Sequence, residues 1–275
     1  MKTMRAVLPI SSAPPSQPSP SLGEGADHAS TTLAIKVANL RELLGRIERE
    51  FSPAAFANSF GAEDMVLTDL IAREFRGIQI FTLDTLRLPR ETLALIDLAR
   101  KKYGFRLATY TPNFDVAEDF VKRNGLFSMY DSVENRKSCC YIRKVEPLNR
   151  ALALKKAWLT GLRREQAPSR QDHGESEFDV EHRCTKFNPL IDWSEDDVWQ
   201  YIRANDVPYN ALHDKGYPSI GCDPCTRAVK PGEDPRAGRW WWEVEDMGGT
   251  QECGLHVKTI DISGLKTAAK IGVAA

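Results

Sequence analysis

The sequence lacks any apolar run of the roughly 20 residues that a membrane-spanning helix requires. It also lacks an excess of charge of one sign, because 37 lysines and arginines are balanced by 38 aspartates and glutamates, for a net charge of −1. Residues 1–10 carry early positive charges but only a short apolar stretch interrupted by Pro9, which makes a poor secretory signal. These absences predict a protein with no membrane partner and no nucleic-acid partner attracted by overall charge.

Cysteine is scarce, and its six copies lack the spacing of a disulfide scaffold. Cys139 and Cys140 are adjacent, and Cys222 and Cys225 are separated by two residues. Cys184 has no partner at a similar spacing, which is typical of a structural thiol. The spacing of the two pairs is typical of metal ligands in a reducing compartment, so we expect a cytoplasmic protein.

The composition divides the 275 residues into one main domain with two terminal segments. The 42% apolar and 27% charged residues are ordinary for a globular protein, and the length suffices for one substantial core. Residues 1–30 are predicted to be a disordered tail, because residues 11–30 are rich in proline, serine and glycine. Residues 31–245 are predicted to form the domain, and residues 246–275 a mobile C-terminal segment.

Helix and strand patterns alternate through the domain. Apolar residues spaced by four and three positions predict a helix over residues 33–51, and further helices are expected after residue 62 and over 89–103, the latter ending at Gly104. Short apolar runs predict strands at 54–59, 78–83, 105–110 and 157–161, and Ser194 is expected to cap a later helix. Alternation of this kind predicts an α/β fold with a mostly parallel sheet covered by helices on both faces.

Two of the predicted strands end in polar or glycine-containing turns. Ser59 and Gly61 follow the first strand, and Leu83 and Thr85 close the next one. The carboxyl ends of parallel strands form a ligand crevice, and a following helix offers free N–H groups to an anion. These turns therefore indicate a nucleotide site, although a tight strand-to-helix turn without a ligand would have the same residues.

The two cysteine pairs together supply four thiolates, which is enough for an iron–sulfur cluster or a tetrahedral zinc. Adjacent side chains on a helix point in different directions, so Cys139 and Cys140 serve one centre only if the backbone bends around it. The apolar spacing of Val145, Leu148 and Leu152 predicts that the pair lies in the first turns of a helix. There the helix dipole would favour an anionic centre.

Basic residues recur beside these motifs and at predicted strand ends. Arginine in such positions is suited to bidentate contact with phosphate or sulfate, so we expect a shared anion pocket. The basic candidates are Arg143, Lys144, Arg163 and Arg164 in the turn that begins at Gly161, and Arg170, Arg227, Arg236 and Arg239.

Cys253 is a candidate nucleophile. It has an acidic neighbour and Gly254, with His256 three positions on, so the glycine would give access and the histidine a charge or a proton. Taken alone, these residues equally describe an unpaired thiol near a chain end.

The chain resembles the assimilatory adenylyl-sulfate reductases, with the related phosphoadenylyl-sulfate reductases close behind. The resemblance covers about residues 35–260 and rests on several separate motifs. These are Ser59-Phe60-Gly61-Ala62-Glu63-Asp64, Leu83-Asp84-Thr85, Cys139-Cys140 with Ile142-Arg143-Lys144, Gly161-Leu162-Arg163-Arg164, residues 219–227, residues 236–243, and Glu252-Cys253-Gly254-Leu255-His256. Two positions depart from the family: Leu86 stands where a glycine usually follows Leu-Asp-Thr, and Pro235 precedes Arg236.

The resemblance implies an adenine-nucleotide α-hydrolase-like fold and thioredoxin-dependent reduction of adenosine 5′-phosphosulfate (APS) to sulfite and AMP through an S-sulfonate on Cys253. It implies a [4Fe–4S] cluster on Cys139, Cys140, Cys222 and Cys225. The other site residues it implies are Lys144 and His256 for catalysis and, for substrate binding, Ser59, Gly61, Leu83, Thr85, Arg143, Gly161, Arg170, Arg236 and Arg239.

Two alternatives stay open at this point, as does whether the chain forms a homo-oligomer. One is the same reaction on 3′-phosphoadenosine 5′-phosphosulfate (PAPS), which carries an extra phosphate. The other is a zinc-stabilised, nucleotide-binding regulator without enzymatic activity. A tRNA-thiolating ATP pyrophosphatase would need a Ser-Gly-Gly-type phosphate loop, which the sequence lacks.

Overall fold

The computed structural model describes residues 25–243, and for residues 25–31 it describes the helical backbone only. Cys253 and His256 therefore lie outside the described residues, as does most of the predicted N-terminal tail. The first helix, α1, spans Gly25–Glu50, so it begins before residue 31, where the composition places the start of the domain. In the described part of the chain, no helix has the length and apolar character needed to span a membrane.

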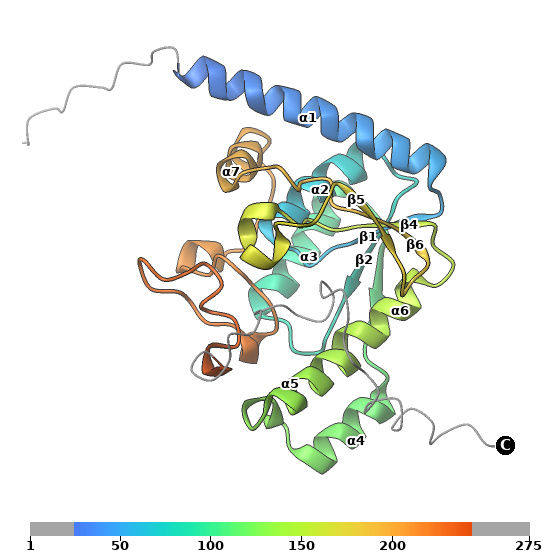
Figure 1. The fold of residues 1–275 in the computed structure, drawn as a ribbon, viewed down its shortest axis with the longest axis vertical. Coiled ribbons are helices and arrows are strands. Elements are labelled where there is room, and N and C mark those ends of the chain that lie inside the picture. The colour runs from blue at the N-terminus through green and yellow to red at the C-terminus, as the bar shows by residue number, and fades with distance from the viewer. Residues whose placement is uncertain (1–24, 244–275) are drawn as a thin grey trace, which may run out of the picture.

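A six-stranded sheet forms the centre of the molecule (Figure 1). Its strand order is β3-β2-β1-β4-β6-β5, and all neighbouring pairs are parallel except β5 with β6. This confirms the predicted mostly parallel α/β fold. The strands are β1 (Ala54–Ala57), β2 (Gln79–Leu83), β3 (Leu107–Tyr110), β4 (Ala157–Leu159), β5 (Ser176–Asp179) and β6 (Cys184–Phe187).

The helices lie on both faces of the sheet, as predicted. After α1 they are α2 (Ala62–Glu74), α3 (Arg90–Tyr103), α4 (Phe114–Asn124), α5 (Val133–Cys140), α6 (Glu146–Leu152) and α7 (Glu195–Ala204), with a π-helical turn, Tyr141–Val145, joining α5 to α6. Figure 1 shows α4 and α5 at the end of the molecule away from α1.

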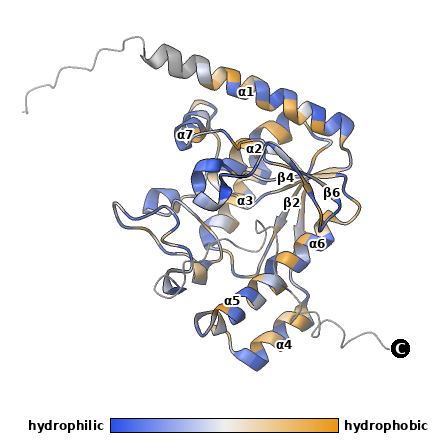
Figure 2. Cartoon of the chain, viewed as in Figure 1, coloured by the Kyte–Doolittle hydropathy of each residue, from blue (hydrophilic) through white to orange (hydrophobic). Residues whose placement is uncertain are grey.

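Alternation along the strands divides the apolar core between the two faces. Phe56 of β1 packs in a large cluster with residues of α1, α2, α3 and α7, whereas its neighbour Ala55 packs with residues of α6 on the opposite face. The α1 helix contributes one apolar side only, and Figure 2 shows hydrophilic and hydrophobic residues alternating along it. Because both faces are covered, ligands have access mainly at the ends of the strands.

Several predicted helix ends are confirmed by their caps. Gly104 closes α3 with a left-handed φ of 64°, a conformation in which glycine has no Cβ penalty. Ser194 begins α7, where its side chain accepts from Asp197 N while the Asp197 carboxylate accepts from Ser194 N. Such caps are visible in a sequence because they depend on local residues.

Two features differ from the sequence-based expectations. The β5–β6 hairpin was not anticipated, because the sequences of these two short strands lack a clear apolar alternation. β6 is mostly buried and places Cys184 in the core, consistent with a structural thiol. The prediction that Cys139 and Cys140 lie in the first turns of a helix is wrong. They are the last two residues of α5, which begins at Val133 after a Ser132 cap that the apolar spacing did not reveal.

Leu86 occupies a backbone conformation that suits glycine. Its φ is +58°, and its N–H donates to Asp84 Oδ1 at 2.9 Å in a tight turn after β2. In this left-handed region a Cβ crowds the backbone at a cost of about 1–2 kcal/mol. The departure from the family's glycine is therefore accommodated with strain, and the leucine side chain is left 57% exposed.

We predict that Leu86→Gly raises the free energy of unfolding by up to about 1 kcal/mol, because it removes the left-handed strain but gives the unfolded chain more freedom. Chemical denaturation measures the change. Leu86→Ala is the matched control: it keeps the Cβ and should leave stability nearly unchanged. A Gly variant no more stable than the Ala variant would contradict this explanation.

Candidate functional site

The carboxyl ends of β2, β1 and β4 lie side by side and open into a cavity of about 330 Å³. The strand order reverses between β1 and β4, and such a switch point is where open α/β sheets bind ligands. The cavity brings together most of the substrate-binding and basic residues that the sequence predicts. They are Ser59, Gly61, Leu83, Thr85, Lys144, Gly161, Arg170, Arg236 and Arg239.

One wall of the cavity is the turn between β1 and α2. Phe60 has a φ of +62° and is buried, and its N–H donates to Asn58 Oδ1 at 2.7 Å. Asn58 also donates through Nδ2 to Thr68 Oγ1 of α2 at 2.7 Å, which ties the turn to the helix. Gly61 then begins α2 with an extended backbone and no side-chain cap. The first turn of α2 thus reaches the cavity without a capping side chain of its own.

Asp64 fixes the shape of this wall. Its Oδ2 accepts from both the N–H and the hydroxyl of Ser59, at 2.6 and 2.7 Å. Burial raises the pKa of Asp64 to about 6, although the hydrogen bonds from Ser59 act in the opposite direction. Gly161, at the end of β4, approaches so closely that a Cβ there would lie 2.3 Å from Asp64 Oδ1. The approach of the two strand ends therefore requires a glycine.

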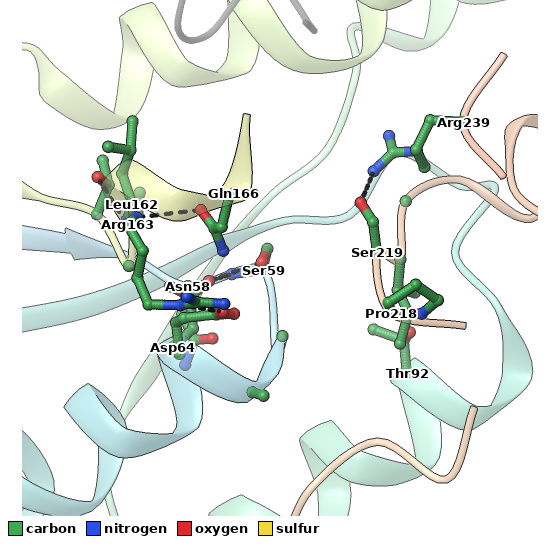
Figure 3. Close-up of a pocket in the computed structure, with 18 of the residues that line it drawn as sticks. Asn58, Ser59, Asp64, Thr92, Leu162, Arg163, Gln166, Pro218, Ser219 and Arg239 are labelled. Carbon is green, nitrogen blue, oxygen red and sulfur yellow. Dashed lines mark hydrogen bonds and ion pairs between the residues drawn. The ribbon is translucent and has the colours of Figure 1, made fainter. Parts of the chain in front are cut away.

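The opposite wall carries Arg239 (Figure 3). Its guanidinium lies 4.8 Å from the ring centre of Trp240 and donates to Ser219 Oγ at 3.2 Å. Its Nε is buried and has no hydrogen-bond partner among the described residues. Gly221 makes room for this arrangement, because a Cβ there would lie 2.3 Å from Arg239 Nη2. Arg239 is therefore held in place by Ser219 and Trp240 while its Nε–H has no acceptor among the described residues, as expected of an anion-binding residue without its anion.

The remaining arginines of the predicted basic pocket divide into two groups. Arg170 is buried in the cavity wall and donates to Gln166, and Arg163 also lines the cavity but pairs with Glu63 at 2.8 Å. By contrast, Arg164 pairs with Asp192 and Arg227 with Glu233, and neither lines the cavity. The sequence thus indicated a basic pocket but did not show which arginines are already engaged in ion pairs.

The four paired cysteines line a second, smaller cavity beside the first. Its other lining residues are Arg87, Met129, Arg136, Arg143 and Lys144. Lys144 and Cys222 line both cavities, so the two share a wall. The predicted substrate residue Arg143 lines only the cysteine cavity.

The π-helical turn explains how adjacent cysteines face one centre. It begins directly after Cys140, and a wider turn of this kind changes the direction of successive side chains and is frequent at functional sites. Since the pair ends α5, the dipole of a helix N-terminus does not act on it, contrary to the expectation from the sequence. The positive field comes instead from the basic side chains around the cavity.

The donor set suits a group larger than one ion. Among residues 25–243, no three histidine, cysteine or acidic side chains converge as the ligands of a single metal ion. Burial is the largest cause that raises the pKa of Cys225, to about 12. The neighbouring thiols of Cys222 and Cys139 also raise this pKa, whereas the positive charges of Lys144 and Arg239 lower it. These thiols are thus close enough to repel each other as thiolates. Four thiolates of this kind would be held together by the positive core of an iron–sulfur cluster, which offsets their mutual repulsion.

Some cavity residues were missed by sequence reasoning. Asn58 precedes the Ser59 motif and Asp64 is its last residue, and both could have been found by asking what holds the turn. His213 could not, because it begins a three-residue 3-10 helix after α7 that has no recognisable motif. Its pKa is lowered by burial, and its Nε2 is buried without a partner in the described part of the chain.

The fold and the cavity define an adenine-nucleotide α-hydrolase-like protein. A model of the phosphoadenosine phosphosulfate reductase domain matches residues 53–228, and the chain belongs to that family. It is 54% identical over 228 residues to proteins of Burkholderia cepacia and Allochromatium vinosum, each named adenosine 5′-phosphosulfate reductase; the match covers 83% of this chain and 90% and 88% of theirs.

A solved structure extends the similarity. The phosphoadenylyl-sulfate reductase of Candida auris, a phosphate complex, is 29% identical with a TM-score of 0.60. The match covers 76% of this chain and all of that one.

We predict that Gly161→Ala lowers the free energy of unfolding by about 1–3 kcal/mol, because the new Cβ must displace Asp64 or the end of β4. Gly61→Ala is the matched control in the same cavity. Its Cβ would meet no atom closer than 3.6 Å and its φ of −72° is ordinary, so it should change stability by less than about 0.5 kcal/mol. Equal effects of the two variants in chemical denaturation would show that the close approach is not a constraint.

Proposed function

We propose that this chain is an adenylyl-sulfate reductase, which reduces APS to sulfite and AMP. The observation that carries the proposal is the wall shared by the strand-end cavity and the cysteine cavity, to which Lys144 and Cys222 belong. A nucleotide that fills the first cavity brings its anionic end toward the basic residues beside the second. The curated relatives named APS reductase support the same reaction.

Each part of the substrate has matching residues in the cavity. The small residues Ser59, Gly61, Thr85 and Gly161, with the apolar side chain of Leu83, suit the nucleoside, because they let a flat ring and a ribose approach the strand ends. Lys144, Arg170, Arg236 and Arg239 supply the positive charge for the phosphate and sulfate. His256 lies outside the described residues and is proposed to join this set.

We propose a [4Fe–4S] cluster on Cys139, Cys140, Cys222 and Cys225 as the resident cofactor. Support comes from four thiols around one small cavity, and from basic side chains that would balance an anionic group. The cluster would fasten α5 to the loop of residues 222–225 and would set the electric field next to Lys144. It donates no electron in the scheme that follows.

The proposed chemistry begins with the thiolate of Cys253. It attacks the sulfur of the sulfate group, the S–O bond to the phosphate breaks, and AMP leaves with that oxygen. The attacking thiolate and the sulfate group are both negative and repel each other. The main contribution of the site is therefore to neutralise this charge with Lys144, Arg236 and Arg239. The product at this stage is an S-sulfonate on Cys253.

A dithiol reductant completes the cycle, and we propose cytoplasmic thioredoxin for this role. One of its thiolates attacks the Cys253 sulfur and expels sulfite, and its second thiol resolves the mixed disulfide. The electrons come from the dithiol, which leaves as a disulfide, while Cys253 returns as a thiolate. Glu243 pairs with Arg136, which lines the cysteine cavity. Cys253 follows Glu243 by ten positions, a length that extends at most about 35 Å, so the chain is long enough for the thiol to reach the neighbouring cavity.

Membership in a reductase family argues against the non-enzymatic zinc regulator. PAPS remains the competing substrate, favoured by the name of the C. auris reductase. The deciding experiment purifies the full chain without oxygen and measures thioredoxin-dependent sulfite release from APS and from PAPS. A higher kcat/KM for APS supports the proposal, a higher value for PAPS replaces the substrate, and no release from either rejects it.

We predict that Cys253→Ser releases no sulfite but still binds APS and keeps its iron. A serine hydroxyl is too weakly acidic to replace the thiolate, and neither binding nor the cofactor depends on this position. In the unchanged protein, APS without thioredoxin should add one SO₃ group to the peptide that contains Cys253, detected by mass spectrometry. Turnover by Cys253→Ser, or a sulfonate on Cys184, would refute the mechanism.

We predict that Cys225→Ser loses most of its iron and sulfide, because three thiolates hold a cubane cluster poorly. Iron and acid-labile sulfide analysis of the purified protein gives the result. The matched control is Cys184→Ala, which removes a buried thiol of β6 that lies outside the cysteine cavity. That control should keep a full complement of iron, whereas full iron in Cys225→Ser would mean that the ligand assignment is wrong.

A further inference from the structure

Arg143 is a buried cation whose charge has no counterion in the described structure. Its side chain is 8% exposed, in the π-helical turn that follows Cys140. Its Nη1 donates to the backbone carbonyl of Thr85 at 2.8 Å. Among residues 25–243, no carboxylate lies within ion-pair distance of it. A carbonyl oxygen satisfies one donor but does not neutralise the charge.

The other arginines of the cysteine cavity are in a different situation. Arg136 forms a bidentate ion pair with Glu243, with both distances 2.8 Å. Arg87 contacts Met129 Sδ and the Leu126 carbonyl, and its side chain is less buried. Arg143 therefore stands out as the deeply buried cavity cation without a carboxylate partner in the described part of the chain.

A buried guanidinium without a counterion is costly, since desolvation of a charge in a protein interior costs several kcal/mol. Such a residue persists where a neighbouring anion offsets the cost. Among the described residues that line this cavity, the only ones that can carry negative charge are the four cysteines. A [4Fe–4S] cluster with four thiolates carries a net negative charge, so it provides that anion.

We propose that Arg143 is the counter-charge of the four-thiolate centre and a positioning residue for it, not the substrate ligand that the sequence predicts. This inference rests on the proposed function, because it needs the cluster. The different positions of two adjacent residues support it: Lys144 lines both cavities, whereas Arg143 lines only the cysteine cavity. Thr85 links the two roles, because its carbonyl accepts from Arg143 and its hydroxyl lies 3.3 Å from Cys222 Sγ.

The test compares Arg143→Gln, Arg143→Lys and the unchanged protein, all purified without oxygen. Loss of one charge-assisted interaction with the cluster should make the Gln variant release iron to a chelator about tenfold faster. Its cluster should also become harder to reduce, giving a more negative reduction potential. The Lys variant keeps the charge and should recover most of both properties. Gln and Lys can both donate to the Thr85 carbonyl, so a loss in Gln with recovery in Lys follows the charge and not this hydrogen bond.

Two further measurements separate this role from others. The dissociation constant for APS, measured on cluster-loaded protein, should be unchanged in Arg143→Gln. Arg150→Gln is the matched control for charge, because Arg150 is exposed on α6 and paired with Glu146. It should alter neither iron release nor the potential.

The outcomes that overturn the inference are distinct from those that overturn the proposed function. If the unchanged protein assembles no iron–sulfur cluster, the cofactor assignment and this inference fail together. If it holds a cluster but Arg143→Gln releases iron at the normal rate with a normal potential, only the inference fails. Weakened APS binding with an unaffected cluster would return Arg143 to the substrate site.

Discussion

The contact between the end of β2 and the two cysteine-bearing segments holds the site together. Thr85 is 1% exposed; its hydroxyl lies against Cys222, accepts from Arg87 N, and its carbonyl accepts from Arg143. The neighbouring Arg87 carbonyl accepts from Asp223 N at 2.8 Å. One strand end therefore contacts two segments that follow it in the chain by 58 residues, at Arg143, and by 137 residues, at Cys222. A ligand that contacts Thr85 at the end of β2 is therefore linked through this one residue to Cys222 and to Arg143, which follows the Cys139-Cys140 pair.

Close approach at two glycines is the second constraint on the cavity. A Cβ on Gly161 would lie 2.3 Å from Asp64 Oδ1, and a Cβ on Gly221 would lie 2.3 Å from Arg239 Nη2, so a larger residue at either position requires its neighbour to move. These close approaches place the carboxyl edge of β4 on one wall and a rigid guanidinium on the other (Figure 3). Local motifs such as Gly-Leu-Arg-Arg and Ile-Gly-Cys are thus packing requirements as well as candidate ligand sites.

The sequence was informative wherever structure depends on local residues. Apolar spacing located the strands that lead into Ser59 and Thr85, and the Ser194 cap located α7. It failed at Cys139, because the helix there begins with a polar turn whose apolar residues do not form a stripe. It also could not separate Arg143 from Lys144. Adjacent residues on a helix differ by about 100° in direction, and the π-helical turn alters that angle in a way that no residue pattern specifies.

The distribution of charge connects these observations. Arg136, Arg163 and Arg227 are each neutralised by a carboxylate, so they stabilise the fold and add little to the field in either cavity. Arg239 keeps an unpartnered Nε, and Arg143 has no carboxylate, within residues 25–243. Uncompensated positive charge is thus concentrated on both sides of the wall formed by Lys144 and Cys222. The substrate anion on one side of this wall and the proposed cluster on the other would each offset the cost of burying the cations beside it.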